Sequence, residues 1–162
     1  MTFLEILWNS EAGKWIMTFL VSMVPVIELR GAIPLGVAHG LSIPGAAFIS
    51  IIGNMVPVPV IILFVRQVFK WLKEKSSKIG RWIVRLEDRA DHQSRMVIDY
   101  QMLGLCLLVA IPLPGTGAWT GALVAAILEL RLKQAVPTIF VGVCIAGVIV
   151  SWLTYAAVHS GL

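Results

Sequence analysis

Long runs of apolar residues dominate the pattern of this chain. Residues 43–65 and 134–158 contain no Asp, Glu, Lys or Arg over 23 and 25 positions. A helix rises 1.5 Å per residue, so about 20 residues cross a hydrocarbon core of roughly 30 Å. Two full transmembrane helices are therefore predicted over these ranges. The first contains Asn54 and two prolines, which predict a kink.

A shorter apolar stretch near the amino terminus cannot span a bilayer by itself. Residues 15–27 are uncharged over 13 positions, or about 20 Å of helix. Pro25 and the ionisable pair Glu28 and Arg30 interrupt the pattern, and a second short apolar piece continues to Ala38. We expect a re-entrant hairpin, in which two short helices turn back inside the membrane. The alternative is one full helix over 15–38 with an internal ion pair.

A second interrupted stretch follows the same plan. Residues 102–128 are uncharged, but prolines and glycines break them near the middle. Pro25 and Pro112 begin the two breaks, and each interrupted stretch precedes one full span. The pattern predicts an inverted repeat of the kind found in secondary transporters. The first repeat covers 1–65 and begins with an interfacial helix, the second covers 100–162, and residues 66–99 link them within one membrane domain.

Composition agrees with a membrane protein. The chain is 58% hydrophobic and 14% charged, with a mean hydropathy of +0.88. Cys106 and Cys144 lie in apolar runs without metal-ligand spacing, so we interpret them as packing residues. No nucleotide-binding, nucleophile or metal motif is present. We therefore expect no enzyme activity, no cofactor and no metal.

The basic residues indicate an orientation. Nine of the thirteen Lys and Arg residues fall in 66–95, and the net charge is +4. Positive charge accumulates on the cytoplasmic side of membrane proteins, so 66–99 is predicted to be a cytoplasmic amphipathic linker and not a nucleic-acid-binding surface. It either binds anionic lipid heads or is a solvated loop. Both termini are then expected outside a multi-pass protein of the cytoplasmic membrane.

Glu28 and Arg30 are the first candidates for function. A charge at bilayer depth costs roughly 2.5 to 3.5 kcal/mol on insertion scales, so such a side chain usually faces protein or a water-filled pathway. Arg30 suits a phosphate or carboxylate. Burial favours the neutral form of Glu28 and Arg30 favours its charged form, which suits a proton carrier. Alternatively, the two residues only neutralise each other or cap the hairpin tip.

Helix ends supply the other candidates. Gly31 is expected to start one half-helix, and residues 115–117 another, each with free N–H groups that attract an anion. The predicted binding residues for substrate or proton are Glu28, Arg30, Gly31, Pro34, Asn54, Pro112, Pro114, Gly115, Thr116, Gly117, Trp119 and Arg131.

Two segments carry a resemblance to a known family. Residues 28–34 (Glu-Leu-Arg-Gly-Ala-Ile-Pro) and 112–121 (Pro-Leu-Pro-Gly-Thr-Gly-Ala-Trp-Thr-Gly) resemble the two signature segments of the small multidrug export protein family of bacteria and archaea. That family is more distantly similar to the DedA/VTT superfamily, which carries two re-entrant hairpins. The resemblance implies a membrane acid, matched by Glu28, and an arginine pair near the second hairpin. The chain departs from the family pattern at the arginine pair, because Arg131 is the one arginine that follows the second interrupted stretch.

The function expected from these patterns is transport. The resemblance implies proton-coupled movement of an amphipathic or phosphate-bearing lipid, such as undecaprenyl phosphate. The alternatives are export of small cationic drugs, with Glu28 as the counter-charge, and a structural or assembly role without transport. Two full spans enclose little space, so we expect a homodimer with membrane lipid around it.

Overall fold

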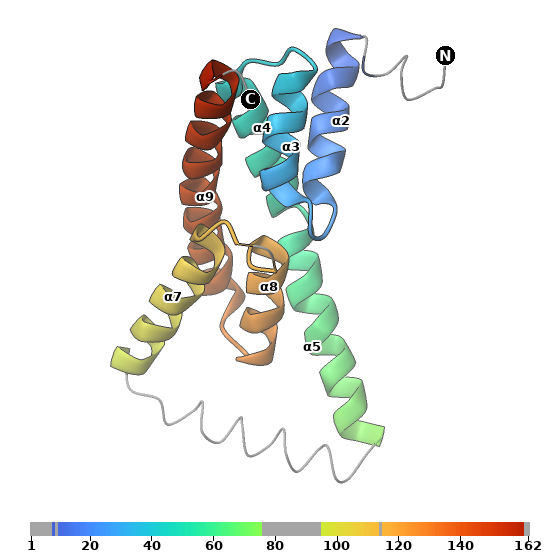
Figure 1. Ribbon diagram of the computed structural model, residues 1–162. Coiled ribbons are helices and arrows are strands. Elements are labelled where there is room, and N and C mark those ends of the chain that lie inside the picture. Colours follow the sequence, from blue (N-terminus) through green and yellow to red (C-terminus); the bar gives the residue numbers. More distant parts are fainter. Residues whose placement is uncertain (1–7, 9, 76–94, 114, 161–162) are drawn as a thin grey trace.

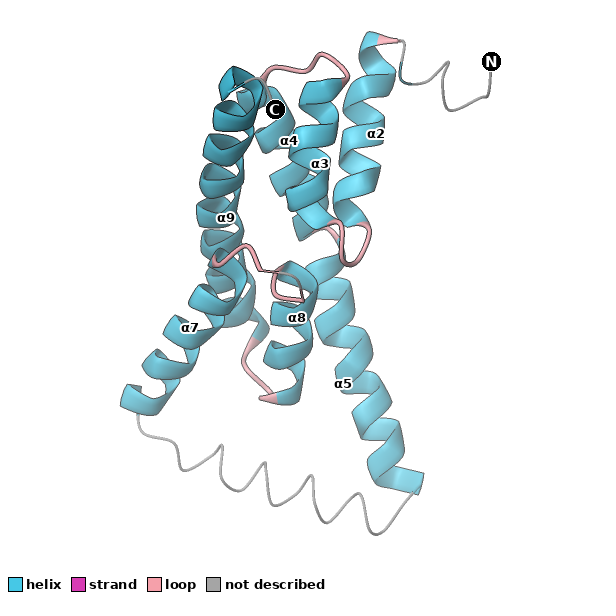
Figure 2. Ribbon diagram, viewed as in Figure 1, coloured by secondary structure: helices cyan, strands magenta, loops and turns pink. Residues whose placement is uncertain are grey.

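The computed structural model describes residues 8, 10–75, 95–113 and 115–160, and Figure 2 shows these residues as helices joined by short loops. The helices in this part of the chain are α2 (Glu11–Met23), α3 (Glu28–Ala38), α4 (Ile43–Met55), α5 (Pro57–Lys75), α7 (Arg95–Ala110), α8 (Ala118–Ile127) and α9 (Leu132–Ser160). The all-helical fold that the sequence predicts is therefore confirmed for the described residues. The predicted interfacial helix over 1–14 lies mostly outside them.

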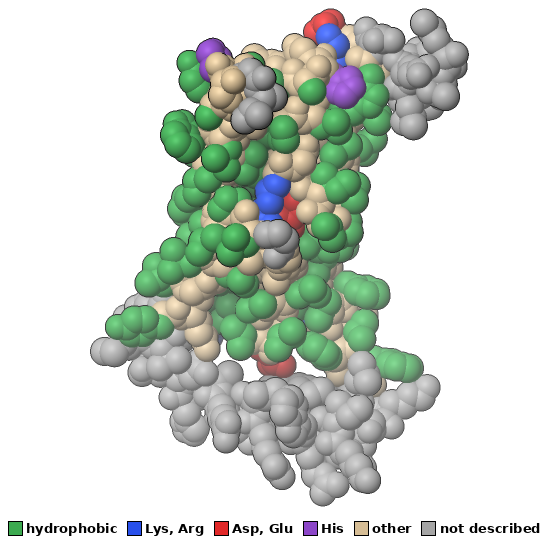
Figure 3. All heavy atoms as spheres, viewed as in Figure 1, with side chains coloured by type: hydrophobic (Ala, Val, Ile, Leu, Met, Phe, Trp, Pro, Cys, Tyr) green, Lys and Arg blue, Asp and Glu red, His purple; other side chains and the backbone are tan. Residues whose placement is uncertain are grey.

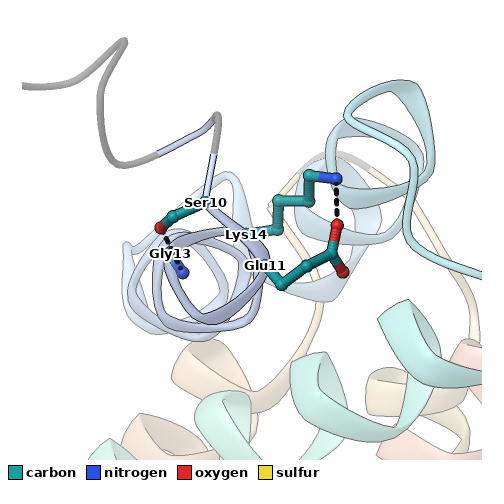
Figure 4. A network of polar contacts seen from close by, with 4 residues as sticks. All are labelled: Ser10, Glu11, Gly13 and Lys14. Carbon is teal, nitrogen blue, oxygen red and sulfur yellow. Dashed lines mark hydrogen bonds and ion pairs between the residues drawn. The ribbon is translucent and has the colours of Figure 1, made fainter.

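Helix α2 begins at a polar cap. The Ser10 side chain accepts a hydrogen bond from the N–H of Gly13 at 3.0 Å, and Lys14 forms an ion pair with Glu11 at 2.7 Å (Figure 4). Both contacts favour a helix start. The helix ends at Met23 because Pro25 follows two residues later and disfavours the helical conformation of its predecessor.

Helices α2 and α3 form a helical hairpin. Residues 24–27, here called the first turn, reverse the chain, and the two helices pack antiparallel. A Cβ built at Gly36 would lie 2.8 Å from Thr18 Oγ1, and one at Gly40 would lie 3.6 Å from Lys14 Nζ. The alternative of one continuous helix over 15–38 is therefore wrong.

The start of α3 also differs from its prediction. The helix begins at Glu28 and not at Gly31, because the residues of the first turn already reverse the chain. Glu28 and Arg30 are thus part of the first helical turn.

The first long span is interrupted as its prolines predict. Helix α4 ends at Met55 and α5 begins at Pro57, and together they form one candidate membrane span over Ile43–Trp71. A proline has no N–H to donate to the carbonyl four residues earlier, so the helix breaks at Val56. Helix α5 continues past the expected end at 65 to Lys75, so residues 66–75 of the predicted linker are helical. Its central part, 76–94, lies outside the described residues.

The second half has the same order of elements. Helices α7 and α8 are separated by residues 111–117, here called the second turn, and α9 is the second candidate span. The predicted break of 102–128 into two short arms is confirmed. Helix α7 begins at Arg95, inside the range expected for the linker.

Local structure recurs between the two halves at a spacing of 89 residues. The Leu41 N–H bonds to the Gly36 carbonyl, and 89 residues later Leu130 bonds to Ala125 in the same way, both at 3.0 Å. The backbone φ is positive at the matching positions Gly40 and Glu129. These paired details show that α3 and α8 end in the same kind of turn.

The close packing of each long helix recurs as well. A Cβ at Gly53 of α4 would lie 2.6 Å from the carbonyl oxygen of Phe19, and one at Gly142 of α9 would lie 2.9 Å from that of Cys106. The two glycines are again 89 residues apart, and the two carbonyls, on α2 and α7, are 87 apart. Each long helix therefore packs on the first arm of its own hairpin.

The two hairpins occupy opposite ends of the molecule. Figure 1 shows α2 and α3 along the upper part and α7 and α8 along the lower part, while α9 runs from the upper end down to the level of α7 and α8. Hydrophobic side chains are spread over the coloured face in Figure 3, with Lys or Arg and Asp or Glu groups adjacent at mid-height. That the hairpins turn back inside a bilayer, and that the halves form an inverted repeat there, stay predictions.

The packing of α2 against α3 generates a topology prediction. Single cysteines at the exposed positions Glu11 and Ser42 should react with a membrane-impermeant maleimide from the same side of the membrane, because both lie at the open end of the first hairpin. A cysteine at the exposed Gln134, beyond the second hairpin, should react from the opposite side. Reaction of the Glu11 and Ser42 positions from opposite sides would contradict the hairpin.

Candidate functional site

The candidate site is the junction of the two turns, and Glu28 is its most deeply buried charge. Its side chain is 3% exposed at the first position of α3. Its backbone φ is +48°, and that of Val26 in the first turn is +77°. Left-handed conformations at residues other than glycine cost roughly 1 to 3 kcal/mol and persist where surrounding contacts hold them. The contacts of Glu28 supply that restraint.

The Glu28 carboxylate caps the start of α8. Its Oε1 accepts a hydrogen bond from the backbone N–H of Trp119 at 3.1 Å. The N-cap residue of α8 is Gly117, which has no side chain to accept from the exposed N–H groups of the first turn. A carboxylate at this place also interacts favourably with the positive end of the helix dipole. An acid of the first half thus completes a helix of the second half.

Gly117 is required by this arrangement for two reasons. Its backbone φ is +129°, a value that L-residues other than glycine rarely adopt. A Cβ at this position would also overlap the Oε2 atom of Glu28. The backbone of the second turn therefore approaches the carboxylate as closely as a glycine permits.

Arg30 binds the second turn from the other side. Its guanidinium donates hydrogen bonds to the Leu113 carbonyl, to Thr116 Oγ1 at 2.9 Å and to the Ile111 carbonyl at 3.3 Å. The Thr116 hydroxyl lies 2.7 Å from the Ile111 carbonyl, to which it can donate while accepting from Arg30. Arginine suits this position because its planar group holds several donors in a fixed geometry.

Trp119 makes the reciprocal contact. Its indole Nε1 donates to the Met23 carbonyl beside the first turn at 3.1 Å. Trp119 lies 89 residues after Arg30, so the two occupy matching positions in the first turns of α8 and α3. Arg30 donates to carbonyls of the second turn, and Trp119 donates to the carbonyl just before the first turn.

The charges of Glu28 and Arg30 bind separate partners. Within the described residues, the hydrogen bonds of Arg30 go to the second turn, and no ion pair joins it to Glu28. The Oε2 atom of Glu28 and the Nε atom of Arg30 are buried without a hydrogen-bond partner. The two residues are therefore connected through the second turn and the start of α8, and not by a direct ion pair.

The other predicted site residues differ in where the structure places them. Thr116, Gly117 and Trp119 contact Glu28 or Arg30 as described above. Asn54 is fully buried and both of its amide atoms lack a partner. Five predicted residues contribute no side-chain contact to the junction. Gly31 is half-buried and Pro34 is exposed inside α3, while Pro112 is half-buried and Gly115 is exposed in the second turn; the fifth is Arg131. Pro114 lies outside the described residues.

Arg131 is far from the junction. It is exposed in the turn that follows α8, a helix whose ten residues extend about 15 Å. The sequence did not reveal a different arginine, Arg66 of α5, which donates to the Leu130 carbonyl beyond the end of α8. No motif marked Arg66, because its partner is a backbone oxygen that only the fold brings near. The carbonyl of Met23 was missed for the same reason.

The sequence also matches a described family over most of its length. The model of the family described as "Putative small multi-drug export protein" matches residues 28–149. The chain belongs to the small multi-drug export protein family. No curated protein and no solved structure matches it. The match begins at Glu28, directly after the first turn, and includes the whole of the second turn. With two helices long and apolar enough to cross a membrane, the small multi-drug export chain is a membrane protein.

The close approach of Gly117 to Glu28 generates a stability prediction. Gly117→Ala should lower stability by roughly 2 kcal/mol or more, since it adds both backbone strain and overlap with the carboxylate. Gly115→Ala is the matched control, because Gly115 has a φ of +83° but open space around its Cβ position. Thermal unfolding in detergent measures both.

The same substitution in a Glu28→Ala protein separates the cost of backbone strain from the cost of overlap with the carboxylate. In a Glu28→Ala protein, the cost of Gly117→Ala should fall toward that of Gly115→Ala. An equal cost of Gly117→Ala in both backgrounds would show that the carboxylate does not occupy this place.

Proposed function

We propose that this member of the small multi-drug export protein family is a proton-coupled transporter whose substrate site is the junction of the two turns. The observation that carries the proposal is the buried Glu28 carboxylate at the start of α8, with one oxygen lacking a partner. An ionisable group held between two separate hairpins links its protonation to the contact between them. In a membrane protein, such a buried acid is a functional candidate by default.

The proposed membrane arrangement is the inverted repeat of DedA-like proteins. Helices α2, α3 and α8 have 13, 11 and 10 residues, or about 20, 17 and 15 Å. Each is shorter than the roughly 30 Å of a bilayer core, which supports two hairpins that enter from opposite sides and meet inside. The proposal includes a cytoplasmic linker, both termini outside the cytoplasmic membrane and a homodimer.

Charge balance supplies the coupling. With Glu28 ionised, its negative charge offsets that of Arg30 at the junction. A proton on Glu28 removes this charge and weakens the cap on α8, because the neutral acid is a poorer acceptor than the carboxylate. Arg30 then remains as the uncompensated charge, so the affinity for an anion rises. By linkage, anion binding raises the affinity of Glu28 for its proton by the same factor.

An amphipathic or phosphate-bearing lipid is the substrate class that this balance supports. The guanidinium of Arg30 is bound to neutral oxygens of the second turn, which a phosphate of a lipid such as undecaprenyl phosphate would replace with a stronger charge-assisted contact. Large apolar side chains are exposed along the helices, as lipid contact requires; examples are Phe64 at 67% and Trp152 at 68% exposed. A second arginine at the junction is absent from the described residues.

Export of small cationic drugs is the second candidate, and the description of the family favours it. Glu28 would then be the counter-charge of the drug, and a proton would release the drug by neutralising the acid. Arg30 opposes this reaction, since it repels a cation at the same place.

Glu28→Gln tests the proposal most simply. The amide keeps the size of the side chain but cannot carry a proton, so flux driven by a pH gradient in proteoliposomes should fall at least tenfold. The assay measures movement of a fluorescent lipid phosphate and, separately, of a cationic dye. Glu11→Gln, at the exposed start of α2, is the matched control and should retain the wild-type rate.

The outcomes separate the candidates. Loss of lipid-phosphate flux supports the first candidate, and loss of dye flux alone supports the second. Unchanged flux of both in Glu28→Gln removes the coupling role, and the absence of flux in the wild type leaves a structural or assembly role.

A further inference from the structure

The buried polar residues are concentrated in the first half. Within the described part of the chain, six polar or charged residues are buried: Thr18, Ser22, Glu28, Ser50, Asn54 and Thr154. All but Thr154 belong to α2, α3 and α4, the helices of the first hairpin and of the span beside it. Buried polar side chains cost free energy unless they are bonded, so this concentration requires an explanation.

The five residues of α2, α3 and α4 lie where these three helices pack against one another. Gly36 of α3 packs on both Thr18 and Ala46, and Gly53 of α4 packs on Ser22. Side chains four residues apart lie on the same face of a helix. Position 32 lies four residues before Gly36 on α3, and Ser50 lies four residues after Ala46 on α4. Because Gly36 packs on Ala46, position 32 lies opposite Ser50.

One further step places Glu28 opposite Asn54. The polar residues therefore form a column that leads from the junction toward the end of the molecule where α2 begins. We call Thr18, Ser22, Ser50 and Asn54 the polar column.

The matching column in the second half is apolar. Residues of the first arms match at a spacing of 87, and residues of the other helices match at a spacing of 89. The residues that match the polar column are therefore Leu105, Val109, Ile139 and Val143, and all four are at most 2% exposed. The position that matches Glu28 is Gly117. The same packing is thus built without polar side chains in the second half, so the fold itself does not require them in the first.

Several atoms of the polar column lack partners. The Ser50 hydroxyl, both amide atoms of Asn54 and the Oε2 atom of Glu28 are buried without a hydrogen bond. Thr18 and Ser22 donate to the carbonyls of Lys14 and Phe19 and keep acceptor capacity. Buried polar atoms without protein partners are the atoms that bind internal water.

We infer that the polar column is a hydrated path through which a proton reaches Glu28 from the side where α2 begins. The inference rests on the proposed function and adds the side and the route. Hydroxyl and amide groups at successive turns bridge water molecules, and the water carries the proton to Oε2. The apolar column of the second half gives no such route, so access to Glu28 is one-sided.

The charged groups around Glu28 are few. On its own helix Arg30 attracts it, while α4 and α8 have no charged or titratable residue. Helix α2 has Glu11 and Lys14 near its far end. Helix α9, which also packs on α3, has Cys144 and Tyr155 along its length, with Lys133 and His159 at its two ends. Within the described residues, Arg30 is therefore the charged group that acts on Glu28, beside the Trp119 N–H, from which its carboxylate accepts a hydrogen bond.

Asn54→Val tests the route, because valine is the residue at the matching position 143. Dicyclohexylcarbodiimide modifies protonated carboxyl groups in apolar surroundings, and mass spectrometry resolves the modification of Glu28. In membrane vesicles of both orientations, modification in the wild type should follow external pH in only one orientation. Asn54→Val should slow that response at least tenfold without lowering thermal stability, since it removes orphaned polar atoms.

Two further variants complete the test. Ser50→Ala should also slow the response, whereas Thr154→Val, which removes a buried hydroxyl outside the polar column, should leave it unchanged. A wild-type response in Asn54→Val, or equal access from both sides, would overturn the route. Because the readout needs no substrate, the route stands if Glu28→Gln leaves flux unaltered while Asn54→Val blocks access. If Glu28→Gln abolishes flux and Asn54→Val retains the response, the route is rejected and the proposed function is kept.

Discussion

The structure depends on one contact between its halves, the Glu28 carboxylate at the start of α8. Neither side of this contact is satisfied alone: α8 begins with a glycine that cannot cap it, and the carboxylate is a charge that is only 3% exposed. Each therefore offsets the cost of the other. Arg30 and Trp119 add a reciprocal pair of hydrogen bonds beside it. Two hairpins far apart in sequence are joined by polar contacts at the middle of an apolar molecule.

Helix α8 is bound to the first half at both ends by opposite charges. Glu28 lies at its amino end, and Arg66 reaches the backbone just beyond its carboxyl end. This order matches the helix dipole, which is positive at the first end and negative at the second. A short apolar helix with its ends held in this way keeps a defined position without long flanking segments. In the proposed mechanism, a proton on Glu28 removes the charge at the amino end and so alters the position of α8.

The sequence predicted the helices better than it predicted their contacts. Prolines at 25, 57 and 112 have local effects on the backbone, so both interrupted stretches and the break in the first span were foreseen. The start of α3 was placed three residues late, because the turn that positions Glu28 uses positive φ at Val26 and not at a glycine. The role of Glu28 as a cap for α8, the bonds of Arg30 to carbonyls and the contact of Arg66 depend on backbone atoms brought together by folding, which no side-chain pattern encodes. Arg131 was selected by charge alone, and the fold places it at the opposite end of α8.

The most direct test of the junction is the distance between its two turns. Spin labels on cysteines at Val26 and Leu113, whose side chains are 87% and 56% exposed, report this distance by electron paramagnetic resonance in lipid. The account predicts one short, narrow distribution at neutral pH, which becomes longer and broader when Glu28→Gln is added. A long or broad distribution with Glu28 intact, or one that Glu28→Gln leaves unchanged, would contradict it.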